Sequence, residues 1–248
     1  MIHPTAVVDP SVEFGPGVEV GPFCRLQGRV SVGAGTRLMT GVVIGGEPMD
    51  RRYAGEETGV AIGCNNTFYE YATVHRSTGA GTLTRIGDAN CIMAYVHIAH
   101  NCRVGSNCTL TNGVQLAGHV EVGDGATIGG LTGVHQFCRI GELAMVGACS
   151  YVNKDVPPFM LAAGNPCRVF GVNTVGLSRA GKTAETVAGL KSAFRLLYRS
   201  GFNLAQALAR IESERLVEIA EVARLTEFCC VAGRGIELRC GQAVSADE

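Results

Sequence analysis

The chain has 248 residues, enough for one large domain or two small ones, and 46% of them are hydrophobic, which is ample for a core. Its net charge of −1 gives no reason to expect nucleic-acid or membrane-surface binding, and no run of about 18 apolar residues predicts a membrane span. Only 17% of residues are charged and 34 are glycine, which favours tight turns over long amphipathic helices.

From the N-terminus an apolar residue recurs every six positions, beginning with Ile2, Val8 and Phe14. Two polar, glycine-rich stretches at about 46–61 and 76–85 interrupt the series, and we interpret them as loops. Twelve uninterrupted hexads then run from Ile86 to Val152. A period of six fits neither a helix nor an alternating sheet, and it predicts a parallel β-helix with 18-residue coils of three faces.

Two prolines, Pro157 and Pro158, follow the last hexads, and because proline cannot donate to a strand ladder we expect the β-helix to span 1–157. Residues 158–174 are predicted to form an irregular connector. Apolar residues then recur at helical spacing, which predicts an α-helical domain over 175–248 with helices at 184–199, 204–211 and 216–230. We expect Gly201 to end the first helix and residues 231–248 to fray.

Four of the eleven cysteines occupy the small fifth slot of a hexad, namely Cys24, Cys102, Cys108 and Cys138. We expect these to be buried free thiols that pack as small apolar side chains. The odd number of cysteines favours a reducing compartment, and the repeat begins at Ile2, which leaves no room for a signal peptide. The sequence therefore predicts a cytoplasmic protein.

Four of the six histidines lie between His97 and His135. Counting 18 residues from His100 leads to Gly118, next to His119, and a further 18 leads to Gln136, next to His135. These residues should therefore line one edge of three consecutive coils. Because the edge of a solenoid is exposed, we expect accessible histidines and not core ones.

Several short motifs resemble one family of hexapeptide-repeat enzymes, the bacterial UDP-N-acetylglucosamine O-acyltransferases that begin lipid A synthesis. The similar segments, which cover nearly the whole chain, are 53–56, 75–76, 96–102, 116–120, 133–137, 155–158, 164–166, 170–173 and 198–201. The resemblance implies a left-handed parallel β-helix and a homotrimer. It also implies transfer of a (3-hydroxy)acyl chain from acyl carrier protein to the 3-hydroxyl of UDP-N-acetylglucosamine, with no metal or other cofactor.

The same resemblance implies roles for individual residues. His100 matches the general base, which must have a pKa near neutrality to activate a hydroxyl, and the N–H of Gly118 matches the donor to the oxyanion. Ala148 matches the site that limits acyl-chain length, and its small side chain predicts a fairly long chain. The positions that match substrate-binding residues are Asp50, Arg52, His97, His119, His135, Gln136, Asn173 and Arg179, the last two reaching the nucleotide from a neighbouring connector. The sequence departs from the family at Asn101, where an aspartate is usual, at Met49 and at Pro166.

A basic cluster in residues 168–199 is interpreted in two ways. One is a docking patch for the acidic acyl carrier protein, formed by Arg168, Lys182, Arg195 and Arg199. The other is an ordinary solvated helix face.

Three other functions stay open at this point. One is a divergent hexapeptide acyltransferase that acts on another sugar nucleotide, such as a 3-amino sugar, or uses acyl-coenzyme A. Another is a metal enzyme like the γ-class carbonic anhydrases, with His75, His97 and His100 around zinc. The third is a scaffold that has lost activity, which the uncharged Asn101 favours.

Overall fold

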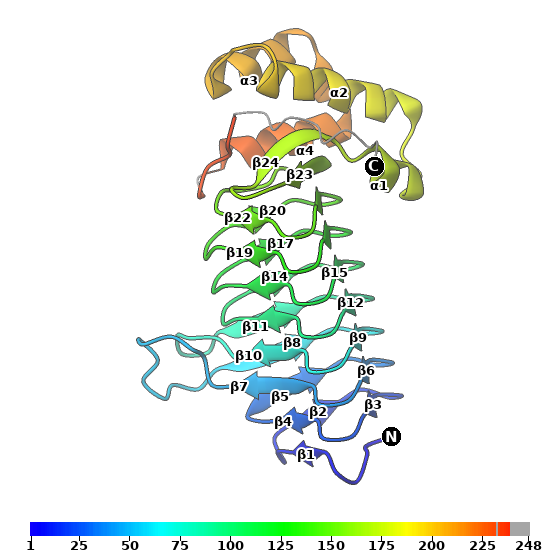
Figure 1. Cartoon of the computed structure of the whole chain (residues 1–248), viewed down its shortest axis with the longest axis vertical. Helices are drawn as coiled ribbons and strands as arrows, with labels where there is room; N and C mark the ends of the chain where they lie inside the picture. The colour runs from blue at the N-terminus through cyan, green and yellow to red at the C-terminus, as the bar shows by residue number, and fades with distance from the viewer. Residues whose placement is uncertain (232, 239–248) are drawn as a thin grey trace.

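The protein is described by a computed structural model over residues 1–231 and 233–238. Its first two thirds form a parallel β-helix, in which each coil gives one short strand to each of three sheets, and its helices cap the C-terminal end of the solenoid (Figure 1). This confirms the fold class predicted from the sequence.

The three sheets contain eight, seven and nine strands. Sheet 1 consists of β1 (Val7–Val8), β4 (Arg25–Leu26), β7 (Val43–Gly46), β10 (Thr73–His75), β13 (His97–Ile98), β16 (Gln115–Leu116), β19 (Gly133–Val134) and β22 (Tyr151–Val152). Sheet 2 consists of β2 (Glu13–Phe14), β5 (Arg29–Val32), β8 (Gly59–Ile62), β11 (Leu83–Ile86), β14 (Arg103–Val104), β17 (Glu121–Val122) and β20 (Arg139–Ile140). Sheet 3 consists of β3 (Glu19–Val20), β6 (Arg37–Leu38), β9 (Thr67–Phe68), β12 (Cys91–Ile92), β15 (Thr109–Leu110), β18 (Thr127–Ile128), β21 (Met145–Val146), β23 (Met160–Ala163) and β24 (Arg168–Val172).

The hexad pattern explains the core. Strand pairs such as Ile98↔Leu116 and Leu116↔Val134 join residues 18 apart, so the first-slot side chains stack into a buried ladder. The fifth-slot cysteines are buried free thiols, as predicted, and the thiols of Cys24 and Cys102 donate to carbonyl oxygens of the next coil. No single coil could bury this ladder alone, so its stability comes from stacking.

The two loops are shorter than the sequence suggested. The first covers 47–58 and the second 76–82, because β8 and β11 each begin before the first hexad residue and pair with one another from Gly59↔Leu83 onward. The extra pairing lengthens these strands to four residues.

The prediction of an irregular connector at 158–174 is wrong. The prolines do not end sheet 3, because β23 runs parallel to β21 and β24 returns antiparallel to β23. In β23 the alternate side chains Met160 and Ala162 are buried over the last coil, and Val169 and Val172 of β24, whose register is irregular, are buried with them. That alternation was the sequence signal for strands, and the two prolines obscured it.

In the described part of the chain four α-helices follow: α1 (Thr174–Arg179), α2 (Ala184–Tyr198), α3 (Leu204–Ser213) and α4 (Ala220–Cys230). The single helix predicted over 216–230 is wrong, because the 3-10 turn η1 (Leu216–Glu218) is separated from α4 by Ile219, whose backbone is extended. No helix in the described residues is long and apolar enough to cross a membrane.

The described part of the C-terminal tail also differs from the frayed segment that we expected. Ile236 forms a parallel bridge with Asp155. Residue 232 and residues 239–248 lie outside the described residues.

Candidate active site

The site lies at the corner where the chain passes from sheet 1 to sheet 2. Three successive connections share this corner: loop 47–58, then loop 76–82, then the short turn 99–102 that contains His100. The next two coils add Gly118 and Gln136. Coils stack at the strand spacing of roughly 4.8 Å, so residues far apart in the sequence meet here.

Three residues at this corner have a left-handed backbone, namely Asn101, His119 and Phe137, with φ between 59° and 66°. Asparagine tolerates this conformation, whereas the other two cost on the order of 1–3 kcal/mol each. The ring of His119 stacks on Phe137 with 4.7 Å between centroids, and it meets His100 edge-on at 5.3 Å. Residues with a left-handed backbone recur at the other corners too, for example Asn107 and Leu131, so this conformation belongs to the turn of each coil and does not by itself mark the site.

Gly118 packs directly against His100. A Cβ at position 118 would lie 2.5 Å from both Cε1 and Nε2 of the imidazole, so no other residue fits without moving the ring. In the described part of the chain no hydrogen bond from the N–H of Gly118 is found, whereas its carbonyl accepts from Phe137. The imidazole and an uncommitted N–H therefore lie side by side.

His100 is less accessible than the sequence suggested: its exposure is 9%. Our expectation of an accessible histidine is wrong for His100, because loop 47–58 reaches over the corner, whereas Gln136 on the same edge is exposed and His119 and His135 are half-buried. A hollow of about 360 Å³ between that loop and the corner is lined by Met49, Asp50, Arg51, Arg52, His100, Gln136 and Phe137. We call it the loop hollow.

The loop brings a carboxylate close to His100. Oδ2 of Asp50 lies 3.9 Å from Nε2 of His100. Arg52 binds the same carboxylate through its guanidinium and its N–H, which holds the pKa of Asp50 well below the usual range. Asp50 is therefore ionised at neutral pH, and its charge is shared between Arg52 and the side of the ring that faces the hollow.

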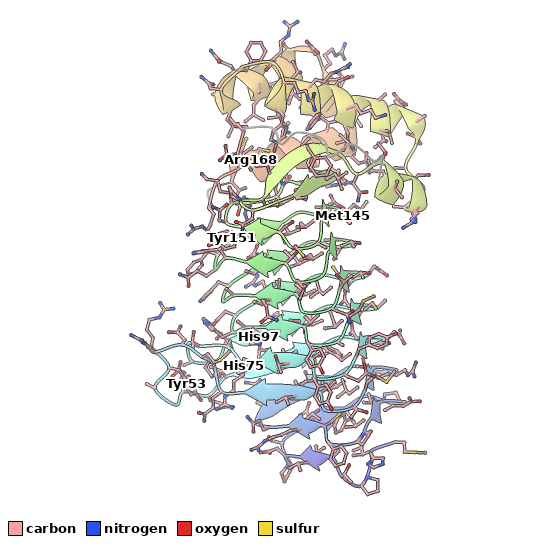
Figure 2. All side chains as sticks on the ribbon, in the orientation of Figure 1. Tyr53, His75, His97, Met145, Tyr151 and Arg168 are labelled. Carbon is pink, nitrogen blue, oxygen red and sulfur yellow. The ribbon has the colours of Figure 1, made fainter. Side chains whose placement is uncertain are left out.

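The neighbouring histidines are pushed toward the neutral form. Burial lowers the pKa of His97 to about 4, with His75 and His100 acting in the same direction, and Nδ1 of His97 lies 2.8 Å from Oγ1 of Thr73. Burial and His100 also lower the pKa of His119. Figure 2 shows Tyr53 on the projecting loop, with His75 and His97 on neighbouring coils beside it. Nowhere in residues 1–231 and 233–238 do three His, Cys, Asp or Glu side chains meet so as to hold a metal ion.

A second hollow of about 540 Å³ extends from His100 along the outer face of sheet 1, and we call it the sheet hollow. It shares Met49, His100 and Gln136 with the loop hollow. Its other lining residues are His97, Ala99, Gln115, Leu116, Ala117, Gly118, Gly133, Val134, His135 and Tyr151. A larger hollow of about 600 Å³ lies between sheet 2 and α4, but it contains no histidine and several of its charged side chains are ion-paired.

Known proteins share both the sequence and the fold. Residues 155–237 match the family model described as UDP N-acetylglucosamine O-acyltransferase, domain 2, and residues 83–118 match that for bacterial transferase hexapeptide (six repeats). The acyl-[acyl-carrier-protein]–UDP-N-acetylglucosamine O-acyltransferase of Verminephrobacter eiseniae is 47% identical over 257 residues, covering 95% of this chain and 98% of that protein. The chain belongs to this O-acyltransferase family.

Solved structures of the family have the same architecture. LpxA from Acinetobacter baumannii superimposes with a TM-score of 0.85 at 38% identity, covering 95% of this chain and 98% of that one. The Francisella novicida UDP-N-acetylglucosamine acyltransferase gives 0.87 at 35% identity, covering 98% and 95%.

Not every predicted site residue meets at this corner. Asn173 caps α1 by accepting from the N–H of Gly176, and its amide donates to the carbonyl of Leu143, at the corner between sheets 2 and 3. Arg179 is exposed at the end of α1, and Ala148 is exposed at the corner between sheets 3 and 1. Within one chain, none of these three residues lies at the corner that contains His100.

Some lining residues were missed by our sequence reasoning. Gln115 and Tyr151 lie 18 and 54 residues after His97, so the period that aligned the histidines would have found them. Arg76 was also missed as a support of the loop: it donates to the carbonyl of Gly45 and to the hydroxyl of Tyr53. These contacts hold loop 47–58 over the corner.

Proposed function

We propose that this chain transfers a 3-hydroxyacyl group from the thioester of acyl carrier protein to the 3-hydroxyl of UDP-N-acetylglucosamine, the first step of lipid A synthesis. Family membership supports this assignment. The observation that carries it is the contact between the His100 imidazole and the backbone of Gly118 beneath the loop that bears Asp50.

In the proposed reaction, Nε2 of His100 removes the proton from the sugar hydroxyl as its oxygen attacks the thioester carbonyl. The carbonyl oxygen becomes an oxyanion, and the N–H of Gly118 is the donor we assign to it. When the tetrahedral intermediate collapses, the carbon–sulfur bond breaks and the imidazolium returns the proton to the departing thiolate.

The two hollows offer partners for the sugar nucleotide. We assign Asp50 and Arg52 of the loop hollow and Gln136, shared by both, to the sugar and the diphosphate. We make the same assignment for His97, His119 and His135, which lie near the corner between sheets 1 and 2. His97 and His119 act as neutral hydrogen-bonding groups, because their lowered pKa values leave them uncharged at neutral pH.

We infer a homotrimer from the distribution of charge over the three sheets. The outward side chains of sheet 2 are mostly charged from β11 on: Arg85, Arg103, Glu121 and Arg139. Those of sheet 3 from β9 to β21 carry no charge: Thr67, Cys91, Thr109, Thr127 and Met145. The corner between sheets 3 and 1 exposes Tyr71, Tyr95 and Leu131. An uncharged face of sheet 3 that ends at this apolar corner suits contact with further copies.

A neighbouring copy would also complete the site. Asn173 and Arg179 lie far from the His100 corner of their own chain, and we assign them to the nucleotide bound next to His100 of an adjacent copy. Ala148 lies on the uncharged corner, where we place an acyl groove between chains. Its small side chain supports a long acyl group.

The basic cluster is proposed as the carrier-protein docking patch, but its four members differ in availability. Arg168 pairs with Glu237 and Lys182 with Glu221 inside the chain. Lys191 and Arg195 are exposed on α2, and Arg199, four residues after Arg195, is exposed as the C-cap of that helix. A row of like charges on one helix face is unfavourable by itself, which supports an acidic partner. Association should weaken as salt rises.

An acyl-transfer assay tests the proposal. Purified protein is mixed with UDP-N-acetylglucosamine and either hydroxyacyl carrier-protein or hydroxyacyl-coenzyme A thioesters of several lengths. We expect product from the carrier-protein donors, and His100→Ala should lower kcat on the order of 10²–10⁴-fold. Product from coenzyme A donors alone, or equal rates for the variant and the wild type, would overturn the assignment.

A further inference from the structure

The two nitrogens of the His100 ring face residues that belong to, or are anchored on, two different loops. Nε2 faces Asp50 on loop 47–58, at 3.9 Å. Nδ1 lies 2.9 Å from Oδ1 of Asn101, whose side chain is anchored on loop 76–82. The orientation of the ring is therefore set through Asn101 and loop 76–82, and loop 47–58 places a carboxylate near its other nitrogen.

The amide of Asn101 has one allowed orientation. Its Oδ1 accepts from the N–H and from the hydroxyl of Thr78, both at 2.9 Å, and its Nδ2 donates to the carbonyl of Thr78 at 2.9 Å. Turning the amide over would place its NH₂ group against the Thr78 N–H and its oxygen against the Thr78 carbonyl. The backbone of Thr78 thus fixes which amide atom faces His100.

This orientation fixes the tautomer of His100. An amide oxygen only accepts hydrogen bonds, so Nδ1 must carry the proton. The lone pair of Nε2 then faces the hollow, which is the form that a general base needs. Unlike a carboxylate, the amide sets this tautomer without adding charge.

Glu56 joins the two loops. Its Oε1 accepts from the N–H of Gly79 and its Oε2 from the N–H of Ala54, both at 2.8 Å. These backbone donors hold the pKa of Glu56 below its ordinary value. Since Gly79 follows Thr78 directly, Glu56 ties the loop that carries Asp50 to the residue that orients Asn101. The segment 53–56 was noted in the sequence only as similar to the family, and the contacts of Glu56 now explain what it does in the structure.

We propose that Glu56, Thr78 and Asn101 form a positioning network that fixes His100 as the Nδ1–H tautomer and keeps Asp50 against its other nitrogen. This deepens the proposed function and rests on it. The three residues act through His100 and Asp50, and we place none of them on the substrate.

The groups around His100 set its electrostatic environment. His97 and His119 are neutral near pH 7, Arg52 is bound to Asp50, and Gly118 and Asn101 carry no charge. In the described residues, Asp50 is the one carboxylate within 4.0 Å of the ring. The imidazolium formed during transfer therefore faces one anion, Asp50, on the side of the loop hollow. On its opposite side it faces the neutral amide of Asn101.

Asn101→Asp and Asn101→Ala test the network. The aspartate keeps an acceptor for Nδ1 and adds a charge, so the acid limb of the kcat/KM profile should move by roughly one pH unit or more to higher pH. The alanine removes tautomer control, so kcat should fall at least tenfold (about 10–10²-fold), with KM for the sugar nucleotide changed less than about twofold.

Asn107 provides a matched control. It has the same left-handed backbone, with φ of 58° against 59° for Asn101, but it is exposed at the corner between sheets 2 and 3. Asn107→Ala and Asn107→Asp carry the same backbone penalty and should leave kcat and the pH profile unchanged. If both Asn101 variants behaved like these controls, the network would have no role.

Glu56→Ala and Glu56→Gln test the link between the loops. The alanine should lower kcat at least tenfold, and the glutamine, which keeps one acceptor oxygen, should recover part of that loss. Glu57→Ala is the neighbouring control, because Glu57 is exposed and its contact with Arg29 is long, at 3.8 Å.

The outcomes separate this inference from the proposed function. A wild-type protein without transfer activity, or an active His100→Ala, contradicts the function. An active wild type and an inactive His100→Ala, combined with normal Asn101 and Glu56 variants, contradict the network alone.

Discussion

Gly118 lies so close to His100 that the side chain of alanine would displace the imidazole. The added Cβ would be 2.5 Å from Cε1 and Nε2. A displacement of about 1 Å at a reacting group costs about 10²-fold in rate. We therefore expect Gly118→Ala to lower kcat on the order of 10²-fold with a nearly unchanged melting temperature, since φ at this position is not positive.

Gly171→Ala is the control for that experiment. Gly171 lies in β24, its φ is not positive, and a Cβ there would meet no atom within 4 Å. Its kcat should match the wild type. A Gly118→Ala enzyme with wild-type kcat would mean that the ring adapts without cost, and that contact with Gly118 does not set its position.

His97 should make the fold sensitive to acid. Its folded-state pKa of about 4 lies below the ordinary value of 6.5, so the unfolded chain binds more protons between these values. Stability due to this residue is therefore present above about pH 6.5 and is lost as the pH falls toward 4. His97→Gln should show a shallower drop in melting temperature from pH 7 to pH 4, and parallel curves for the two proteins would contradict the assignment.

At the scale of elements, an ion pair buried in the last coils supports the contact between the solenoid and the helical tail. The carboxylate of Asp155 is fully buried and accepts from the N–H and the guanidinium of Arg139. Arg139 also donates to the carbonyls of Phe228 and Val231 and lies 4.1 Å over the ring of Phe228. Asp155 thus fixes the residue that connects β20 to the end of α4.

Removing one partner of such a pair leaves a buried charge without compensation. Asp155→Ala should lower the free energy of unfolding by about 3–5 kcal/mol, measured by denaturant titration. Arg210→Ala breaks the exposed pair with Glu214 on α3 and should change it by less than about 1 kcal/mol. Equal effects of the two variants would show that the Asp155 contact does not hold the tail.

The sequence predicted what the six-residue period determines, and little of what lies outside that period. Counting by 18 placed His100, Gly118 and Gln136 on one edge, because the solenoid converts sequence distance directly into height. Counting did not predict that His100 is nearly buried. The ring is covered by Asp50 and the residues next to Asp50, which lie about 50 positions earlier in the sequence and outside the period. Nor did counting find β23. The two prolines argued against a strand there, but the burial of Met160 and Ala162 against the last coil stabilises one.

At the scale of the whole molecule, the three faces of the solenoid differ in kind. Sheet 2 presents charged side chains to solvent, whereas the corner between sheets 3 and 1 exposes Tyr95 at 62% and Leu131 at 72%. A chain that stayed alone would expose this apolar edge along several coils. Asn173 and Arg179, which we propose to contact the nucleotide, also lie away from His100 of the same chain, and both features support the proposed trimer.

Leu131→Glu tests that assembly. Light scattering should give the mass of three 26.0 kDa chains for the wild type. In the variant, each copy would bury a charge at the shared edge, so we expect the mass of a single chain. Because Leu131 is exposed within one chain, the circular dichroism of the variant should stay that of a folded β-helix, while acyl transfer is lost together with Asn173 and Arg179 of the adjacent copy. Arg85→Glu, on the charged face of sheet 2, should keep both the assembly and the activity. Two results would contradict the assembly: a monomeric wild type with full activity, or a single-chain Leu131→Glu variant that stays active. In either case every substrate contact would come from one chain, and Asn173 and Arg179 would have no part in the site.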